Sequence, residues 1–461
     1  MLLGTAGGGV TSVVLWRRRG QDRSLSIDRA LASEEAIRLG DLRLARKLAT
    51  EARELDPTGH PAALAFVRVC AFDVIDGDGG QAASVELLSD ARKLGIRGAD
   101  LAFVSLAAAV GVKNDRLAER ILAEHAEKAI VVDERYAYAA GAAFDLMCSE
   151  EAERRYTVAD DLSHGDLFLA KVRRARALLF AARMDEARKV IATLPKERRE
   201  TMVLRSLADH VAVLSDGAPP KAAPAWVDPS WVTELPRSLR ALATAMALGD
   251  PNAPSGQSAG LDAALDDVDT PLAALLAGRI ALAAGDEVSA KAASACALRM
   301  RAELPEAKVF AARLALVDGD LAHARELAGE GPDKPIVLMI QAIEAYERGD
   351  KTRLAEIDQE SVGAPRRFEG LAAAKALLGE GEIPKPAAFD EAIAKNEPWA
   401  DLLAVDAALA SHDVERAKKL ALAWSEGPLS DARKVRKKRI ESAPVDKDGA
   451  KPDDKPEPKK K

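Results

Sequence analysis

Two consecutive runs of residues near the N-terminus carry apolar side chains at helical spacing, and a glycine separates the runs. The apolar positions are Ala32, Ala36, Leu39, Ala45, Ala49 and Ala52. Their spacing of three or four residues predicts two helices, each with one narrow apolar face. Gly40 is expected to end the first helix, because glycine adopts the left-handed conformation without strain, and Asp41 is expected to cap the second. Pro57 cannot continue a helix, so the unit is a helical hairpin.

Comparable turns recur along most of the chain. The turn residues, several of them glycine followed by aspartate, lie near positions 77, 113, 149, 183, 217, 249, 285, 319, 349, 379 and 412. Five prolines, each fourteen residues before a turn, repeat the same period in the C-terminal half: Pro271, Pro305, Pro335, Pro365 and Pro398. Proline is favoured in the first turn of a helix, where its missing N–H costs nothing. A single hairpin cannot bury its apolar face alone, so the period predicts an array of stacked hairpins.

The composition agrees with a helical array. Hydrophobic residues make up 48% of the 461 residues but aromatic residues only 4%, so the core must be built largely from Ala, Leu and Val. Alanine and leucine are strong helix formers, and no long alternating pattern of β-branched residues competes with them. We therefore predict an all-α fold.

The charge is distributed unevenly. Residues 1–23 carry +3 and residues 433–461 carry +6, which leaves −16 on the residues between them out of a total of −7. A nucleic-acid-binding surface needs basic residues to contact phosphates, so no nucleic-acid partner is expected for this acidic body. The three cysteines lie far apart without metal-ligand spacing, and buried free thiols are expected.

In its repeat pattern the chain resembles the tetratricopeptide-repeat (TPR) family, as a degenerate TPR-like α-solenoid of bacterial type. The residues that match the family pattern are Gly278, Gly285, Ala290 and Ala297 in one repeat and Gly40, Ala45, Ala52 and Pro57 in another. The aromatic residues usual in the family are mostly replaced by alanine or other non-aromatic residues. Over roughly residues 26–428 the resemblance implies a right-handed α-solenoid of about 11–12 helix–turn–helix repeats of 30–37 residues. It also implies that the protein binds other proteins.

Breaks in the repeat pattern predict five regions. Residues 1–20 comprise an apolar segment and the three arginines that end it. Residues 26–215 form one solenoid half. Residues 216–260 are a break rich in proline that also holds two tryptophans, either as a plug or as a contact surface. Residues 261–428 form the second half. Residues 429–461 combine a basic run, expected to be a solvated helix or a contact with anionic lipid, with a disordered Lys/Asp/Pro-rich tail.

The N-terminus indicates a contact with a membrane. Met1 to Trp16 carries no charge and is followed directly by Arg17, Arg18 and Arg19, the order found at membrane–water boundaries. Sixteen helical residues span roughly 24 Å, which is shorter than a hydrocarbon core of about 30 Å. We expect membrane association through residues 1–19 with the solenoid in the cytoplasm. The alternatives are a soluble cytoplasmic protein or a periplasmic one.

No catalytic chemistry is evident in the sequence. It contains none of the motifs GxxxxGK[ST], GxSxG and HExxH and no protein-kinase set. The acidic stretch that starts at Asp76 fails as a calcium loop, because Gln81 and Leu87 occupy the positions that need glycine and glutamate. The six histidines are isolated. We therefore predict no catalytic, cofactor-binding or metal-binding residue, no cofactor, and a protein that is not an enzyme.

The resemblance to the TPR family implies a binding groove. Arg279 and Arg313 occupy equivalent positions of consecutive repeats on the expected concave side, and Met339 and Tyr346 follow in the next repeat. A stacked pair of arginines beside apolar surface could hold a peptide carboxylate or carbonyl groups. The other interpretation is that both arginines pair with acidic residues of adjacent helices and bind nothing.

The predicted function is a non-catalytic scaffold that binds a protein or peptide partner in this groove, tethered at the membrane. The alternatives are a structural subunit of an envelope or secretion assembly and a TPR array that regulates an associated enzyme.

Overall fold

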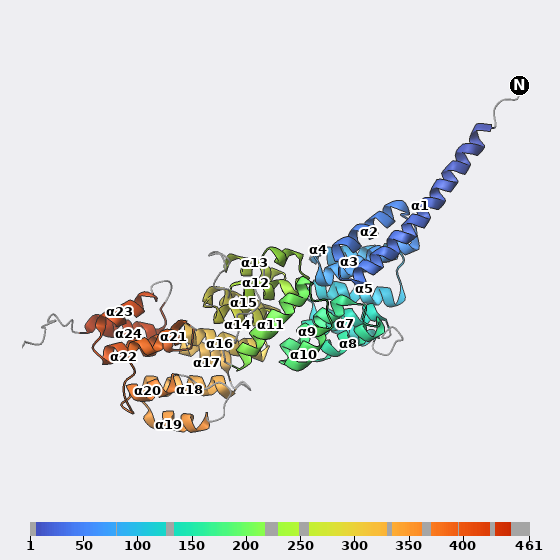
Figure 1. The fold of residues 1–461 in the computed structure, drawn as a ribbon. Helices are drawn as coiled ribbons and strands as arrows, with labels where there is room; N and C mark the ends of the chain where they lie inside the picture. The colour runs from blue at the N-terminus through green and yellow to red at the C-terminus, as the bar shows by residue number, and fades with distance from the viewer. Residues whose placement is uncertain are drawn as a thin grey trace, which may run out of the picture. The chain divides into compact units, whose positions relative to one another are not determined.

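The computed structural model describes residues 6–79, 81–125, 133–216, 229–248, 258–329, 334–361, 370–394, 396–424 and 429–443. In these ranges the chain forms 24 α-helices and two short 3₁₀-helices and no strand (Figure 1), so the predicted all-α fold is confirmed. The chain divides into two compact units, Met1–Ala307 (unit 1) and Lys308–Lys461 (unit 2). Each unit is described by itself.

Unit 1 is built from consecutive helices, and most of these helices pack against the next one or two along the chain. Its helices are α1 (Ala6–Arg38), α2 (Leu42–Leu55), α3 (His60–Asp76), α4 (Gln81–Lys93), α5 (Gly98–Gly111), α6 (Asp115–His125), α7 (Glu134–Leu146), α8 (Glu151–Leu162), α9 (Phe168–Phe180), α10 (Met184–Ala192), α11 (Arg199–Asp216), η2 (Pro229–Glu234), α12 (Arg237–Leu248), α13 (Ser258–Asp266), α14 (Pro271–Ala283) and α15 (Glu287–Met300).

Unit 2 follows the same local plan up to its last helix. The helix α16 (Pro305–Val317) contains the boundary between the units. The others are α17 (Leu321–Ala328), α18 (Lys334–Arg348), α19 (Lys351–Glu360), α20 (Leu371–Leu377), η3 (Pro386–Phe389), α21 (Asp390–Ala394), α22 (Ala400–Ala410), α23 (Val414–Leu422) and α24 (Asp431–Ser442).

The turns predicted from glycine and aspartate lie between consecutive helices. Gly285 has φ 85°, and the N–H of Asp286 donates to the carbonyl of Ala281 at 2.9 Å, which closes the end of α14. The Asp286 carboxylate then accepts from the N–H of Ser289 at 3.0 Å and caps α15. The same arrangement occurs at Gly40–Asp41, Gly319–Asp320, Gly349–Asp350 and His412–Asp413. One dipeptide thus ends a helix and starts the next.

Three of the expected turn positions either differ from this arrangement or lie outside the described residues. Gly77 follows α3 with φ −100°, so the chain leaves that helix without a left-handed residue. The expected turns at Gly217 and Gly249 lie outside the described residues, as do residues 217–228 and 249–257 of the predicted break. Between those two segments, α12 packs against α11, α13 and α14.

Buried alanines lie at the contacts between paired helices, as the pattern predicted. Ala45, Ala49 and Ala52 of α2 are fully buried, and Ala52 joins Ala30 and Ala62 in a small apolar cluster that links α1, α2 and α3. Ala290, Ala324 and Ala417 have the equivalent place in later hairpins and are also fully buried. Small side chains at these sites let two helix backbones lie close together.

Enlarging one of these alanines is expected to destabilise unit 2. Ala324→Leu inserts extra atoms where the side chain is 0% exposed, so we expect a loss of about 1–3 kcal/mol. Glu326→Leu on the same helix is the control, because the Glu326 side chain is 81% exposed. The melting temperature of each variant is measured, and that of Ala324→Leu should be clearly the lower. Equal melting temperatures would show that the helical register is misassigned.

A network of buried charges, which we call the Arg–Asp cluster, holds unit 1 together. Its members are Asp76, Asp145, Arg173, Arg176 and Asp269, and all five are buried. The Arg173 guanidinium lies 3.0 Å from Asp76 and 3.0 Å from Asp269, and Arg176 lies 2.8 Å from both Asp145 and Asp269. These residues come from α3, α7, α9 and the segment before α14. The cluster therefore joins segments that are far apart in the sequence.

Hydrogen bonds complete the Arg–Asp cluster. The Tyr156 hydroxyl donates to Asp145 at 2.7 Å, and Arg176 donates to the carbonyl of Ser238 on α12 at 2.8 Å. Burial raises the pKa of the Asp269 carboxyl, but the facing guanidinium groups of Arg176 and Arg173 lower it more, so its net pKa lies well below the ordinary value. Buried charges are tolerated only when they are paired in this way.

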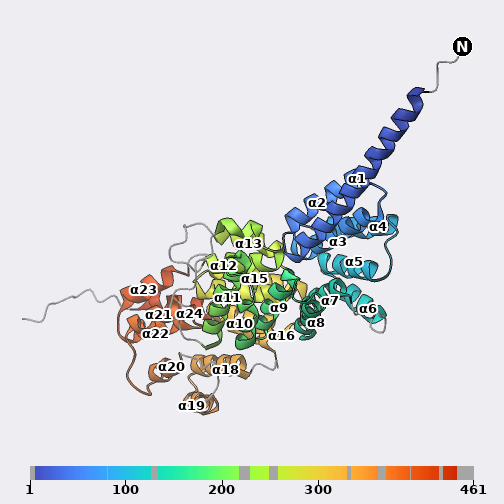
Figure 2. The same cartoon turned by 45° about the vertical axis from the view of Figure 1, so that its right-hand side comes forward.

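At the N-terminus, α1 continues from the apolar stretch into the first predicted repeat helix without interruption. Figures 1 and 2 show its N-terminal part extending beyond α2 and α3, which pack along its C-terminal half. Within the part of the chain that the structure describes, no helix has the length and apolar character needed to cross a membrane. The side chains of residues 1–19 lie outside that part.

Candidate functional site

The basic run near the C-terminus forms the helix α24, and its arginines repeat at every third position. Ser430 caps the helix by accepting from the N–H of Arg433 at 3.4 Å. Arg433, Arg436 and Arg439 follow one another at three-residue spacing, with lysines at positions 434, 437 and 438. Residues three apart lie on neighbouring positions of a helix surface, so the three arginines point to the same side.

Arg436 lies on this side of α24 and is buried against other helices of unit 2. Its side chain is 3% exposed, and its Nη2 lies 2.6 Å from both Asp406 of α22 and Glu347 of α18. Burial lowers the pKa of Arg436, but the Asp406 and Glu347 carboxylates raise it more, so the guanidinium stays charged. The expectation of a solvated helix is therefore wrong for Arg436, because acidic side chains from two other helices pair with it.

The arginines on either side of Arg436 extend the contact along the helix. Arg433 donates from Nη2 to Asp401 of α22 at 2.9 Å and to the carbonyl of Val317 at the end of α16, also at 2.9 Å. Arg439 donates to the second oxygen of Asp406 at 2.9 Å. The three arginines together bind groups from α16, α18 and α22.

We call the groups that receive these arginines the α24-binding surface. It comprises the Val317 carbonyl and the side chains of Glu347, Trp399, Asp401, Asp406 and Trp424. The indole N–H of Trp399 donates to Glu347 at 3.1 Å, and that of Trp424 donates to Asp401 at 2.6 Å. The Glu347 and Asp401 carboxylates are thus held in position by indole N–H groups. A surface whose carboxylates are held in this way favours a helix with cationic side chains at matching positions.

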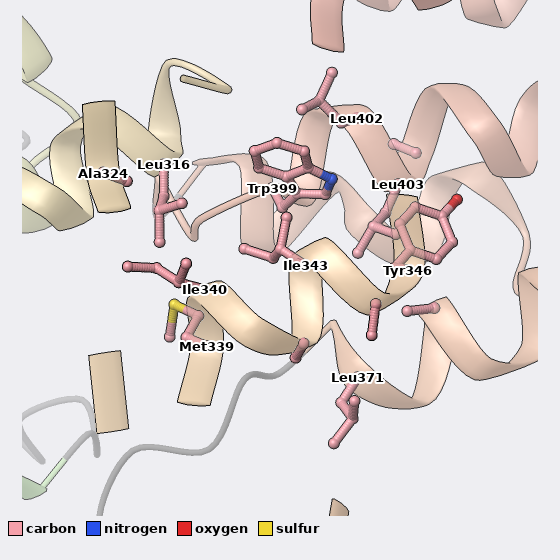
Figure 3. Packing of buried hydrophobic residues seen from close by; sticks show 14 of the residues in the cluster. Leu316, Ala324, Met339, Ile340, Ile343, Tyr346, Leu371, Trp399, Leu402 and Leu403 are labelled. Atoms are coloured by element: carbon pink, nitrogen blue, oxygen red, sulfur yellow. The ribbon is translucent and has the colours of Figure 1, made fainter. Parts of the chain in front are cut away.

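Two of the residues expected in the groove are buried in the core of unit 2, and one of them contacts this surface. Met339 and Tyr346 of α18 are each 9% exposed and belong to the hydrophobic core of unit 2 (Figure 3). The Tyr346 hydroxyl donates to Asp406 at 2.7 Å. Burial and then the neighbouring Asp406 carboxylate raise the pKa of the Tyr346 hydroxyl above its ordinary value. Tyr346 therefore positions one of the carboxylates that bind α24.

The two arginines of the expected groove belong to different units. Arg313 of α16 is partly buried and lies 3.3 Å from Glu397 in unit 2, which agrees with the interpretation that it pairs with an acidic residue. Arg279 of α14 is also partly buried and belongs to unit 1. The stacking of Arg279 on Arg313 stays a prediction, as does their contact with a partner.

The residues of α24 and of the surface beneath it were not among the site residues predicted from the sequence. One signal was available, because within the basic run every arginine is three residues from the next and every other basic residue is lysine. Arginine is preferred over lysine for partly buried ion pairs, since its planar group binds carboxylates in a fixed geometry. The identity of the receiving acids, Glu347, Asp401 and Asp406, could not be read from the sequence.

A polar pocket in unit 1 is a second candidate site, and two of its cationic side chains are bound by neighbouring groups of the protein. It lies between α8, α9 and α10 and is lined in part by Asp160, Lys171 and Arg174. Lys171 donates to the carbonyl of Gly165 at 2.6 Å, and Arg174 lies 3.0 Å from Glu153. Among the described residues, no group of histidine, cysteine and acidic side chains could hold a metal ion.

No protein-family model matches the sequence, and no curated protein matches it at a significant level.

Proposed function

We propose that this protein is a non-catalytic scaffold that binds a protein or peptide partner, and that the α24-binding surface of unit 2 is the binding site. The observation that carries this proposal is the seating of α24. Unit 2 receives a helix through side-chain contacts with elements that are distant in the sequence, from Val317 to Trp424. Recognition of one face of a helix in this way is a recurring mode of peptide binding.

The surface is suited to selective binding rather than to chemistry. Its polar groups are carboxylates held by tryptophan and tyrosine donors, and each carboxylate faces a guanidinium. Charge-assisted hydrogen bonds of this kind fix both the register and the orientation of a bound helix. The proposal therefore includes no catalytic residue, no cofactor and no nucleic-acid partner.

The proposed architecture is a right-handed, TPR-like α-solenoid. Three features support it: the left-handed turn residues between consecutive helices, the fully buried alanines between paired helices, and the repeat period of the sequence. In such an array neighbouring repeats together form an extended surface, which suits binding of a helix or an extended peptide.

Site-specific photo-crosslinking in cells that make the protein would test the binding site. A photoreactive amino acid replaces Arg348 or Ala423, which are exposed and adjoin Glu347 and Trp424 of the surface without belonging to α24, and Val288 of unit 1 is the control position with 74% exposure. We expect one protein to be crosslinked at the two positions beside the α24-binding surface and not at Val288. Crosslinks at none of the positions, or equally at all three, would count against unit 2 as the binding site.

The crosslinked protein must then bind in purified form. We expect Glu347→Gln together with Asp401→Asn to weaken its binding at least tenfold, since these changes keep side-chain size and remove the charges. Glu326→Gln with Glu415→Gln is the matched control on exposed acids and should leave the affinity unchanged. Equal affinity for all of these proteins would remove the α24-binding surface as the partner site.

The proposal also includes membrane association through residues 1–19, with the helical units in the cytoplasm. Full-length protein is expected to sediment with membranes and to remain there through a high-salt wash, whereas a chain that starts at Gln21 should stay in the supernatant. Release of the full-length protein by salt alone would reduce the N-terminus to an electrostatic contact, because salt screens charges but leaves apolar insertion intact.

A further inference from the structure

Most of α24 faces solvent, and its attachment to unit 2 is chiefly ionic. Among its residues only Arg436 and Ile440 are buried, and Val435 is 55% exposed. Ion pairs link Arg433 to Asp401, Arg436 to Glu347 and Asp406, and Arg439 to Asp406. A helix held by charges with little apolar burial is held less firmly when salt screens those charges.

The acids beneath α24 can be hydrated once the helix leaves. Arg436 comes near the end of the described chain, and α24 covers the acids that it pairs with. Removal of the whole helix would expose Asp406 to water, and the Glu347 side chain is already 28% exposed, so no unpaired charge would remain buried. The core of unit 2 around Ile343, Leu402 and Leu403 is formed mainly by α16 to α23 (Figure 3).

We propose that α24 is a displaceable internal ligand, and that the surface it covers accepts a helix of another protein with arginines at three-residue spacing. This inference rests on the proposed function, because it assigns the partner class and the regulation of the same site. In this arrangement α24 competes with the partner, and a partner binds only to the fraction of molecules whose α24 has left.

The geometry at Arg436 specifies arginine. Asp406 Oδ2 accepts from Nε at 3.0 Å and from Nη2 at 2.6 Å, while the same Nη2 also donates to Glu347. A lysine ammonium is a point charge and cannot make the paired contacts of a planar guanidinium. The partner helix should therefore carry Arg-x-x-Arg-x-x-Arg, and an apolar residue at the place of Ile440 would complete the match.

Breaking α24 inside the full-length chain tests the proposal. Val435→Pro removes a helical hydrogen bond in the middle of α24, because proline lacks the N–H and clashes with the preceding turn. It leaves the three arginines and the whole α24-binding surface unchanged, and Val435→Ala is the matched control. The probe is a fluorescent peptide with the sequence of residues 429–443, whose binding is measured by anisotropy.

We expect the peptide to bind the Val435→Pro protein at least tenfold more tightly than the wild type or the Val435→Ala protein. A peptide with all three arginines changed to lysine should bind the Val435→Pro protein at least tenfold more weakly. Absence of peptide binding by a folded Val435→Pro protein would overturn the proposal. Equal binding of the arginine and lysine peptides would overturn the assigned partner class.

A second measurement on the wild-type protein covers the case in which Val435→Pro unfolds unit 2. Amide hydrogen exchange of residues 431–442 is expected to be faster than that of α22, and 0.5 M NaCl, on the order of a 4 Å Debye length, should speed it further. Exchange of α24 and α22 in one common event would overturn the proposal. The crosslinking result is independent of it, so the binding function can stand when displacement of α24 fails.

Discussion

Arg173→Met is expected to lower the free energy of unfolding of the protein by about 3–5 kcal/mol. The substitution keeps a long side chain but removes the charge that faces Asp76 and Asp269 in the Arg–Asp cluster. Asp76 is buried, and Arg173 is its ion-pair partner in the structure. A carboxylate left unpaired in such a site has lost its hydration without compensation, so it must either take up a proton or open the surrounding helices.

Arg174→Met provides the control for this prediction. Arg174 is the next residue, its side chain is 27% exposed, and it pairs with Glu153 at 3.0 Å. Ion pairs near the surface contribute about 0–1 kcal/mol, so this substitution should have little effect. Urea unfolding followed by far-ultraviolet circular dichroism compares the two variants. A similar loss for both would mean that the Arg–Asp cluster does not hold unit 1 together.

Trp399→Ala should cost unit 2 about 3–5 kcal/mol, because it opens a large cavity in the core. The Trp399 indole is 1% exposed and lies among Leu316, Ile343 and Leu402 (Figure 3). It also donates to Glu347, which positions that carboxylate for α24. The residue has φ 68°, a left-handed conformation that a bulky residue adopts only when its surroundings hold it there.

Two companion variants separate packing from hydrogen bonding at this site. Trp399→Phe keeps most of the apolar volume and loses the indole N–H, so a clearly smaller loss of stability is expected. Leu422→Ala on α23 removes a side chain that is 70% exposed and should change the melting temperature very little. Equal melting temperatures for Trp399→Ala and Leu422→Ala would contradict a core position for the indole.

Local patterns were sufficient to predict the helices and many of their turns. Gly285 and Asp286 show why, since the first residue needs only the absence of a Cβ and the second only a carboxylate next to three N–H groups. The alanine stripe of α2 was equally predictable, because three residues at helical spacing share a face whatever packs against it. These features depend on neighbours within a few positions of the chain.

The pairings of charged residues were decided by the tertiary structure. Arg173 lies next to Arg174 in the sequence and has the same side chain, yet one is buried among aspartates and the other is partly in solvent. Arg436 and Lys437 differ in the same way. The sequence did not distinguish the members of these pairs, because the environment of a charge depends on acids that other helices bring to it.

The position of the candidate site was likewise decided by the tertiary structure. Tyr346 was expected to face a partner, and it is instead covered by the core and bonded to Asp406. The basic run was expected to be solvated, and its arginines reach acids contributed by α18 and α22. Helix formation follows from local geometry, whereas the burial of a charge depends on the sum of its desolvation and its ion pairs across the whole unit, and the folded chain alone fixes that sum.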